Sequence, residues 1–281
     1  MQHSTSSNIK KIIHLILSFI MAILLTALTV AGVLQFTLLN ESFMLDTMDT
    51  CNYFAEKRTE ITRSLTDLGY ASGLDEDFFE DFLDVVMLHN DTSNYLDDYY
   101  SGDGSVVDKT AFKQAFNTSL DSYISKKGID PASVSQENRD YLINEAAKIY
   151  KQSLELPFFG RIAGRFQNLK TIIPYVIGFC LVMIALLCVI IVLTSKWKHR
   201  AVRYICYATS ATFLTTAVLP AVILISGKIN TFNIASRATY MLFVAFANNM
   251  LVAMLACSAF FLLISIALFM LYKNLYGKVS D

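Results

Sequence analysis

The stretch Ile12–Leu39 reads IIHLILSFIMAILLTALTVAGVLQFTLL and contains no Asp, Glu, Lys or Arg. A bilayer core needs roughly 20 apolar residues of helix, so this stretch is long enough to cross a membrane. Lys10 and Lys11 precede it as in a secretory signal peptide, and Thr29–Ala31 is a tolerable cleavage site. However, the apolar core of a signal peptide has only about 7–15 residues. We therefore expect this stretch to be retained as a membrane anchor.

Three further apolar runs have the length and composition of membrane spans. Hydrophobic residues make up 54% of the 281 residues, above the roughly 45–50% that is typical of soluble domains. The sequence predicts an all-α integral membrane protein, with an extracytoplasmic helical bundle inserted between the first and second of four transmembrane helices. The predicted spans are 12–39, 171–194, 201–226 and 247–272, and the predicted bundle is 40–170.

Charge is distributed unevenly along the chain, although its formal net charge is only −1. Of the 24 acidic residues, 23 lie between Glu41 and Glu155. Lys and Arg instead collect near the span ends that face one side, and such residues mark the cytoplasmic side. We therefore predict a multi-pass plasma-membrane protein with both termini inside. Cytoplasmic segments are then 1–11, 195–200 and 273–281, while the loop or interfacial helix 227–246 lies outside with the bundle.

Residues 40–170 are expected to form helices because apolar residues recur there at spacings of three and four. We expect the first span to continue outward as one helix to about Leu68. The acidic stretch Asp75–Asp84, DEDFFEDFLD, is expected to form an amphipathic helix with its phenylalanines on the buried side. Further helices are expected over 92–100, from Asp108 to Gly128, and over 136–154.

The segment 157–166 reads PFFGRIAGRF and lies just before the second span. Aromatic and cationic side chains together are typical of a membrane interface. We predict that this segment couples the outside domain to the spans. The candidate residues are Phe158, Phe159, Arg161, Arg165 and Phe166.

His89 is the single histidine of the outside segment and therefore the candidate for a general base. No serine or cysteine stands at a recognisable motif spacing from it, and no HExxH motif is present. A histidine at the end of a helix, without a catalytic role, is the simpler interpretation. The sequence therefore predicts no catalytic residue and no cofactor.

The stretch 97–108, DDYYSGDGSVVD, is similar to a calcium-binding loop, with Asp103 and Asp108 as candidate ligands. Calcium loops of this type begin with Asp and end with Glu. Here Tyr99 and Thr110 occupy those two positions. We therefore interpret the stretch as a polar turn between helices and predict no metal site.

Asn248 and Asn249 stand near the start of the fourth span. Amides at membrane depth must find hydrogen-bond partners, so they either lie at the interface, bridge helices or line a polar pocket. No Asp, Glu or Lys occurs inside any of the four runs. Because working residues of pumps are ionisable groups at membrane depth, this pattern argues against ion or proton transport.

The leading hypothesis is a membrane protein whose extracytoplasmic domain binds a partner protein or ligand, as an anchor, sensor or accessory subunit of a membrane complex. One alternative is a membrane-interface enzyme that acts on lipid or lipoprotein through His89. Another is a small transporter component that uses Asn248 and Asn249. The expected partners are the lipid bilayer and either a protein partner or a second copy of the chain, and not nucleic acid.

Overall fold

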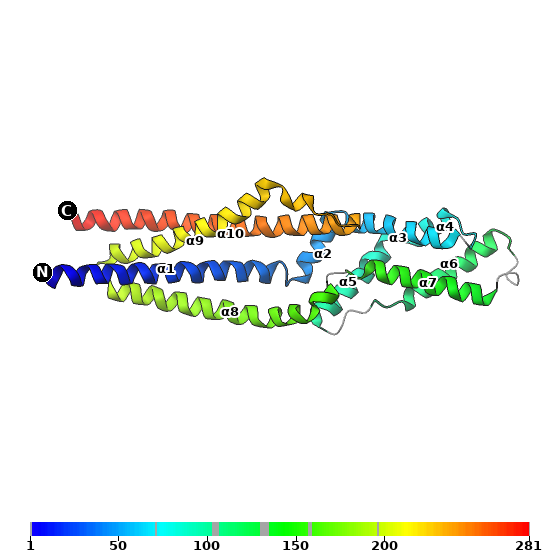
Figure 1. Ribbon diagram of the computed structural model, residues 1–281, viewed down its shortest axis with the longest axis horizontal. Helices are drawn as coiled ribbons and strands as arrows, with labels where there is room; N and C mark the ends of the chain where they lie inside the picture. Colours follow the sequence, from blue (N-terminus) through cyan, green and yellow to red (C-terminus); the bar gives the residue numbers. More distant parts are fainter. Residues whose placement is uncertain are drawn as a thin grey trace. The chain divides into compact units, whose positions relative to one another are not determined.

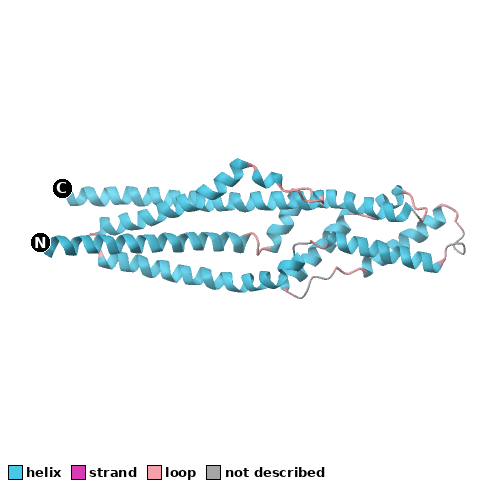
Figure 2. Ribbon diagram, in the orientation of Figure 1, coloured by secondary structure: helices cyan, strands magenta, loops and turns pink. Residues whose placement is uncertain are grey.

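The structure is a computed structural model that describes residues 2–280 except 71, 103–106, 130–134, 157–158 and 196. Helices joined by short loops make up this part of the chain, and it contains no strand (Figure 2). Four helices are long and apolar enough to cross a membrane, within Lys10–Phe36, Arg165–Thr194, Lys198–Ser226 and Arg237–Gly277. The prediction of an all-helical chain with four candidate transmembrane helices is therefore confirmed.

The chain forms two compact units. The first contains residues 1–40, 168–232 and 246–281, and the second contains residues 41–167 and 233–245. Two helices, α8 (Phe159–Thr194) and α10 (Arg237–Ser280), begin in the second unit and continue into the first.

The first unit contains the long apolar helices. It is built from α1 (Gln2–Phe36), α9 (Lys198–Ser226), the short 3-10 helix η2 (Lys228–Thr231) and most of α8 and α10. The start of α1 and the end of α10 lie at the same end of this unit (Figure 1). A core formed by α1, α8 and α9 holds it together, with Met21, Leu25, Ile191, Tyr204 and Ala208 buried.

Hydroxyl side chains connect α9 to α10 in this unit. The Ser258 hydroxyl of α10 lies 2.8 Å from the Thr216 hydroxyl of α9, and also 2.8 Å from the Met254 carbonyl of its own helix. The Ser265 hydroxyl of α10 donates to the Thr209 hydroxyl of α9 over 2.8 Å. Thr216 and Thr209 in turn donate to carbonyls of α9 itself. These contacts join two apolar helices without a buried charge.

The second unit is a bundle of short helices around α3 (Tyr53–Tyr70), which packs against four of them. The predicted helix 136–154 is observed as α7 (Gln136–Leu154) with the same bounds. Ser135 before it and Glu155 after it are both extended, and the Ser135 side chain makes no capping hydrogen bond. The other helices are α2 (Glu41–Thr50), α4 (Glu76–Phe82), α5 (Val85–Ser101) and α6 (Thr110–Lys126), with the first turns of α8 and α10.

The prediction that the first span continues as one helix to about Leu68 is wrong. The helix α1 ends at Phe36, and the chain leaves the helical conformation twice before α3, at residues 37–40 and 51–52. Asn40 stands immediately before α2, and Asn is a favoured residue type at that position. Asn52, between α2 and α3, has a φ of 57°, a left-handed conformation that Asn adopts more readily than most residues. The two asparagines thus interrupt an otherwise helical pattern.

The acidic stretch forms α4, with its aromatic side chains turned inward as predicted. Phe78 and Phe79 are buried, and the ring of Phe78 lies edge-on to that of Phe116 in α6 at 5.5 Å. The helix stops at Phe82 because Asp84 caps the next helix, its side chain accepting the Val86 N–H at 3.3 Å. The expected helix 92–100 is therefore part of a longer helix, α5.

Candidate functional site

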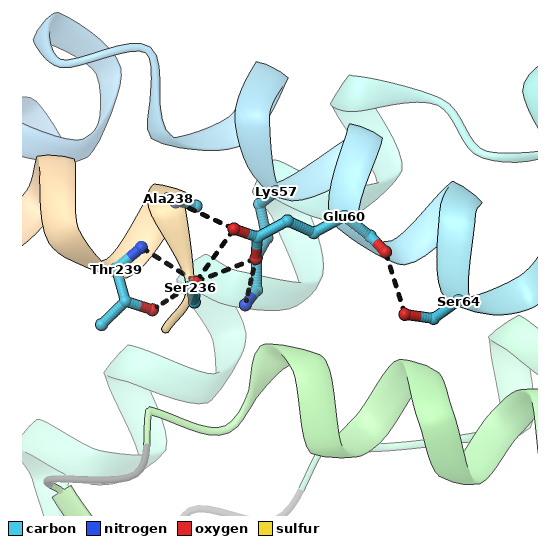
Figure 3. A network of polar contacts seen from close by, with 6 residues as sticks. All are labelled: Lys57, Glu60, Ser64, Ser236, Ala238 and Thr239. Carbon is cyan, nitrogen blue, oxygen red and sulfur yellow. Dashed lines mark hydrogen bonds and ion pairs between the residues drawn. The ribbon is translucent and has the colours of Figure 1, made fainter. Parts of the chain in front are cut away.

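A polar network lies on one side of α3 (Figure 3). Lys57 and Glu60 are three positions apart and therefore share a helix face, and the Lys57 Nζ lies 3.4 Å from Glu60 Oε2. Lys57 is only 7% exposed. A buried ammonium group needs a compensating charge, and the Glu60 carboxylate supplies it.

The same carboxylate holds the N-terminus of α10. Glu60 Oε1 accepts the Ala238 backbone N–H at 3.0 Å, and Oε2 accepts the Ser236 hydroxyl at 2.8 Å. The Ser236 Oγ accepts the Thr239 N–H at 3.1 Å (Figure 3). The first N–H groups of a helix have no partner within that helix, and negative charge is favoured there by the helix dipole. Glu60 and Ser236 thus cap α10 together.

The electrostatics of the network favour an ionised Glu60. Burial by itself would raise the pKa of this carboxyl, but the hydrogen bonds from Ala238 and Ser236 and the charge of Lys57 outweigh burial, so its pKa is lowered. Burial lowers the pKa of Lys57, and the interaction with Glu60 offsets part of that effect. A carboxylate whose pKa lies below its ordinary value is charged at neutral pH.

Two further side chains belong to this region of α3. Tyr53, one turn before Lys57, is fully buried, and within the described part of the chain its hydroxyl has no hydrogen-bond partner. Burial, and secondarily the charge of Glu60, raise the pKa of Tyr53. Arg237 pairs with Glu56 at 3.4 Å, but Arg237 is 74% exposed, and such surface pairs contribute little. Of these two polar contacts between α3 and α10, the one made by Glu60 is therefore the stronger.

Phe166, a predicted coupling residue, lies in the core of the second unit and is 2% exposed. Its ring lies 4.9 Å from that of Tyr99 and 5.0 Å from that of Tyr100 in α5. The next residue, Gln167, donates from Nε2 to the Tyr99 carbonyl at 3.0 Å. The early turns of α8 are thus docked on α5.

The other residues of the predicted coupling segment are placed less fully. Arg165 is exposed on α8. Phe159 and Arg161 lie at the start of α8, and their side chains are outside the described structure, as is the whole of Phe158.

His89, the candidate base, lies beside an acid. Its Nε2 is 3.6 Å from Asp49 Oδ1, with side chains 39% and 52% exposed, and its ring centroid is 4.9 Å from that of Phe54. The 3.6 Å between His89 Nε2 and Asp49 Oδ1 is longer than a hydrogen bond. The structure therefore brings His89 and Asp49 together at the surface of the bundle.

The candidate metal ligands are not gathered into a site in the part of the chain that the structure describes. Asp108 is exposed, and its Oδ1 accepts the Thr110 N–H at 2.8 Å at the start of α6. That hydrogen bond lowers the pKa of Asp108. Asp103 lies outside the described residues. No group of three or more His, Cys, Asp or Glu side chains that could hold a metal ion occurs among the residues described.

Asn248 and Asn249, the two amides near the start of the predicted fourth span, lie on α10 within the first unit. Asn248 is half-buried and Asn249 is exposed.

Sequence reasoning missed both Glu60 and Ser236. Ser236 carried a usable signal, because a serine directly before a long apolar helix is a favoured N-cap. Glu60 carried none, since its role depends on a partner 176 positions away.

No protein-family model matches the chain, and neither a curated protein nor a solved structure matches it. The class that its own features define is an all-helical chain with four candidate transmembrane helices, as in a multi-pass membrane protein.

Proposed function

We propose that this chain is a multi-pass plasma-membrane protein with cytoplasmic termini, whose second unit lies outside and binds a partner protein or ligand. It would serve as an anchor, sensor or accessory subunit of a membrane complex. One observation carries the proposal: Glu60 of α3 holds the first turn of α10, and α10 continues without interruption as a candidate transmembrane helix. A displacement of α3 by a bound partner therefore acts directly on that helix.

The chain segments that form the second unit support this topology. Residues 41–167 and 233–245 pack together, which supports a topology with the segment after the first span and the segment before the fourth on the same side of a membrane. The distribution of Lys and Arg independently assigns both segments to the outside. The helix α8 is attached to the same unit independently of α10, because Phe166 and Gln167 pack against α5.

The first test is of topology. Protease added to intact cells should cleave the second unit, and a reporter fused to the C-terminus should be active only in the cytosol. Protection of the second unit in intact cells, with cleavage after lysis, would overturn the proposed orientation.

The second test is of partner binding. The full chain is purified from its native membrane in mild detergent, and co-purifying proteins are identified with wild-type protein and with Glu60→Ala. The matched control is Glu145→Ala, which removes an acid that pairs with Lys148 of its own helix. We expect one partner protein to co-purify stoichiometrically with the wild type and with the control. Its binding to Glu60→Ala should be weaker. A bare monomer in every sample would contradict the binding function.

A second candidate function, a membrane-interface enzyme acting on lipid or lipoprotein, is favoured by the proximity of His89 and Asp49. A carboxylate beside the imidazole is the arrangement that orients the ring in histidine-dependent enzymes. The test is incubation of purified protein with phospholipid or lipoprotein and mass-spectrometric detection of products. Equal product formation by wild-type protein and His89→Ala would remove this candidate.

A further inference from the structure

A groove of about 480 Å³ lies between α9 and α10 in the first unit. Its lining is mostly apolar and includes Leu262, Ile266 and Phe269, and Lys273 lies at its end. Ser265 also lines it, but the hydroxyl of that residue already donates to Thr209. The groove thus combines an apolar length with a cation at one end.

The length of the groove matches one leaflet of a bilayer. Leu262 and Lys273 are 11 positions apart on α10, which is about 16 Å at 1.5 Å per residue. Half of the hydrocarbon core of a bilayer is about 15 Å. Lys273 therefore lies at the headgroup level if Leu262 lies near the midplane.

Cations and aromatic side chains gather at that end of the groove. His199, in the first turn of α9, has its ring centroid 6.4 Å from Tyr272 and 5.7 Å from Tyr276, so the start of α9 lies beside the end of α10. Arg203 lies one turn further along α9, its guanidinium carbon 5.3 Å from the Tyr204 ring centroid. Tyrosine and cationic side chains are typical of the headgroup level.

Acidic residues are almost absent from the sequence of this unit. Within residues 1–40, 168–232 and 246–281, which form the first unit, the only acidic residue is the terminal Asp281. Basic pockets between transmembrane helices at the cytoplasmic surface bind acidic lipid headgroups. The charge therefore favours an anionic occupant over a zwitterionic one.

We propose that the groove between α9 and α10 binds a phospholipid with an anionic headgroup. Its acyl chain lies along Leu262 and Ile266, and its phosphate binds Lys273, the charged residue of the lining. Arg203, one turn of α9 before the lining residue Cys206, supplies a second cation beside that end of the groove. A comparison comes from a second groove, about 420 Å³, between α1 and α9, whose lining includes no charged side chain. The inference goes beyond the proposed function and rests on it for the insertion of the helices in a bilayer and for the cytoplasmic position of the Lys273 end.

The single tryptophan of the chain makes the proposal testable. Trp197 directly precedes α9, is 42% exposed and lies 6.2 Å, between ring centroids, from His199. The full chain is reconstituted in phosphatidylcholine vesicles that contain a fraction of brominated lipid. The brominated lipid is phosphatidylglycerol in one sample and phosphatidylcholine in the other, and in both the bromine is on the acyl chain near the headgroup. Bromine quenches tryptophan fluorescence at short range. We expect the brominated phosphatidylglycerol to quench Trp197 more strongly at equal mole fraction.

Charge variants test the headgroup contact. One basic residue near an anionic lipid surface changes association about fivefold, so Arg203→Gln and Lys273→Gln should each reduce the preference for phosphatidylglycerol by about that factor. The matched control is Lys228→Gln, which removes an exposed lysine just beyond the opposite end of α9, and it should leave the preference unchanged.

Groove variants test the acyl-chain contact without changing charge. Ile266→Phe places a larger side chain in the groove, whereas Leu263→Phe changes a neighbouring residue that is 66% exposed and is not part of the lining. We expect only Ile266→Phe to lower the phosphatidylglycerol preference. An unchanged preference in Ile266→Phe would overturn the assignment of the groove.

Other results of the quenching experiment would overturn different parts of the proposal. Equal quenching by the two brominated lipids would overturn the anionic-lipid proposal while leaving membrane insertion supported. Equal quenching together with a stable dimer in the vesicles would assign the groove to a second copy of the chain. Absence of quenching by either lipid would contradict membrane insertion at Trp197, and with it the proposed function.

Discussion

The Glu60 carboxylate and the Ser236 hydroxyl, 176 positions apart in the sequence, lie 2.8 Å from each other. This hydrogen bond joins the central helix of the second unit to the N-terminus of α10. The Ala238 N–H binds the same carboxylate at 3.0 Å. The Glu60 carboxylate is therefore one attachment of the fourth apolar helix to the bundle, beside the buried side chains of Ala238 and Leu242.

Replacing Glu60 with Ala should lower the free energy of unfolding by about 2–4 kcal/mol. The change leaves the Ala238 N–H without an acceptor and the buried Lys57 ammonium without its acid, and each such loss is costly. Glu60→Gln should cost less, because an amide oxygen still accepts from the N–H. The measurement is denaturant unfolding of the detergent-solubilised protein. Glu145→Ala is the control, with an expected change below about 0.5 kcal/mol.

The contribution of Glu60 should also depend on pH. Because its pKa is lowered in the folded state, the ionised carboxylate stabilises the fold above the ordinary glutamate pKa of about 4.3. This contribution is lost as the pH falls through the lower, folded pKa. The stability difference between wild-type protein and Glu60→Gln should therefore be full at pH 7 and shrink toward pH 3. A difference that grows on acidification would contradict the assigned charge state.

Buried tyrosines should destabilise the second unit at alkaline pH. Burial raises the pKa of Tyr99 to about 12, and burial and a 2.6 Å hydrogen bond to Asp91 raise that of Tyr150. A raised tyrosine pKa contributes stability that is complete below the ordinary value of about 10 and is lost as the pH rises above it. Thermal unfolding should shift downward between pH 10 and 12. Tyr150→Phe should weaken this alkaline shift while lowering stability at pH 7 by about 1 kcal/mol.

Gly69 permits close packing of α3 on α4. A Cβ at this position would lie 2.5 Å from Phe79 Cε2, and Phe79 is fully buried. Gly69→Ala should therefore destabilise the protein by about 1–3 kcal/mol through overpacking. Gly178→Ala is the matched control, since nothing lies within 4 Å of a Cβ there. Partial rescue of Gly69→Ala by Phe79→Leu in thermal unfolding would identify the clash as the cause, and its absence would argue against it.

Phe166 should be the main anchor of α8 on α5. Removing a buried phenylalanine ring costs about 3–5 kcal/mol, so Phe166→Ser should weaken the bundle by a comparable amount. Hydrogen exchange of α5 near Tyr99 and Tyr100 should accelerate in this variant. Arg165→Ser, which changes the exposed neighbour, should leave that exchange unaltered. Equal exchange in both variants would show that α8 is held by other contacts.

The parts of the fold that depend on local patterns could be predicted from the sequence. The four apolar helices follow from the length of their hydrophobic runs, and α7 follows from a serine before its apolar stripe. The breaks at Asn40 and Asn52 were missed because the apolar spacing of three and four continues on either side of them. The site was missed for a different reason. Glu60 is one acid among many in its region, and only packing shows that it meets Ser236.

The hydroxyls between α9 and α10 bear on how freely α9 can turn about its own axis. Thr216 and Thr209 already donate to carbonyls of α9, and Ser258 has the Met254 carbonyl of α10 within the same distance as Thr216. If α9 rotates, the Ser258 hydroxyl can donate to that carbonyl instead, whereas the Ser265 hydroxyl loses the Thr209 oxygen to which it donates. The Ser258–Thr216 pair therefore tolerates a small change in the rotation of α9, and the Ser265–Thr209 hydrogen bond opposes it, so the rotational register of these two helices depends on the second pair.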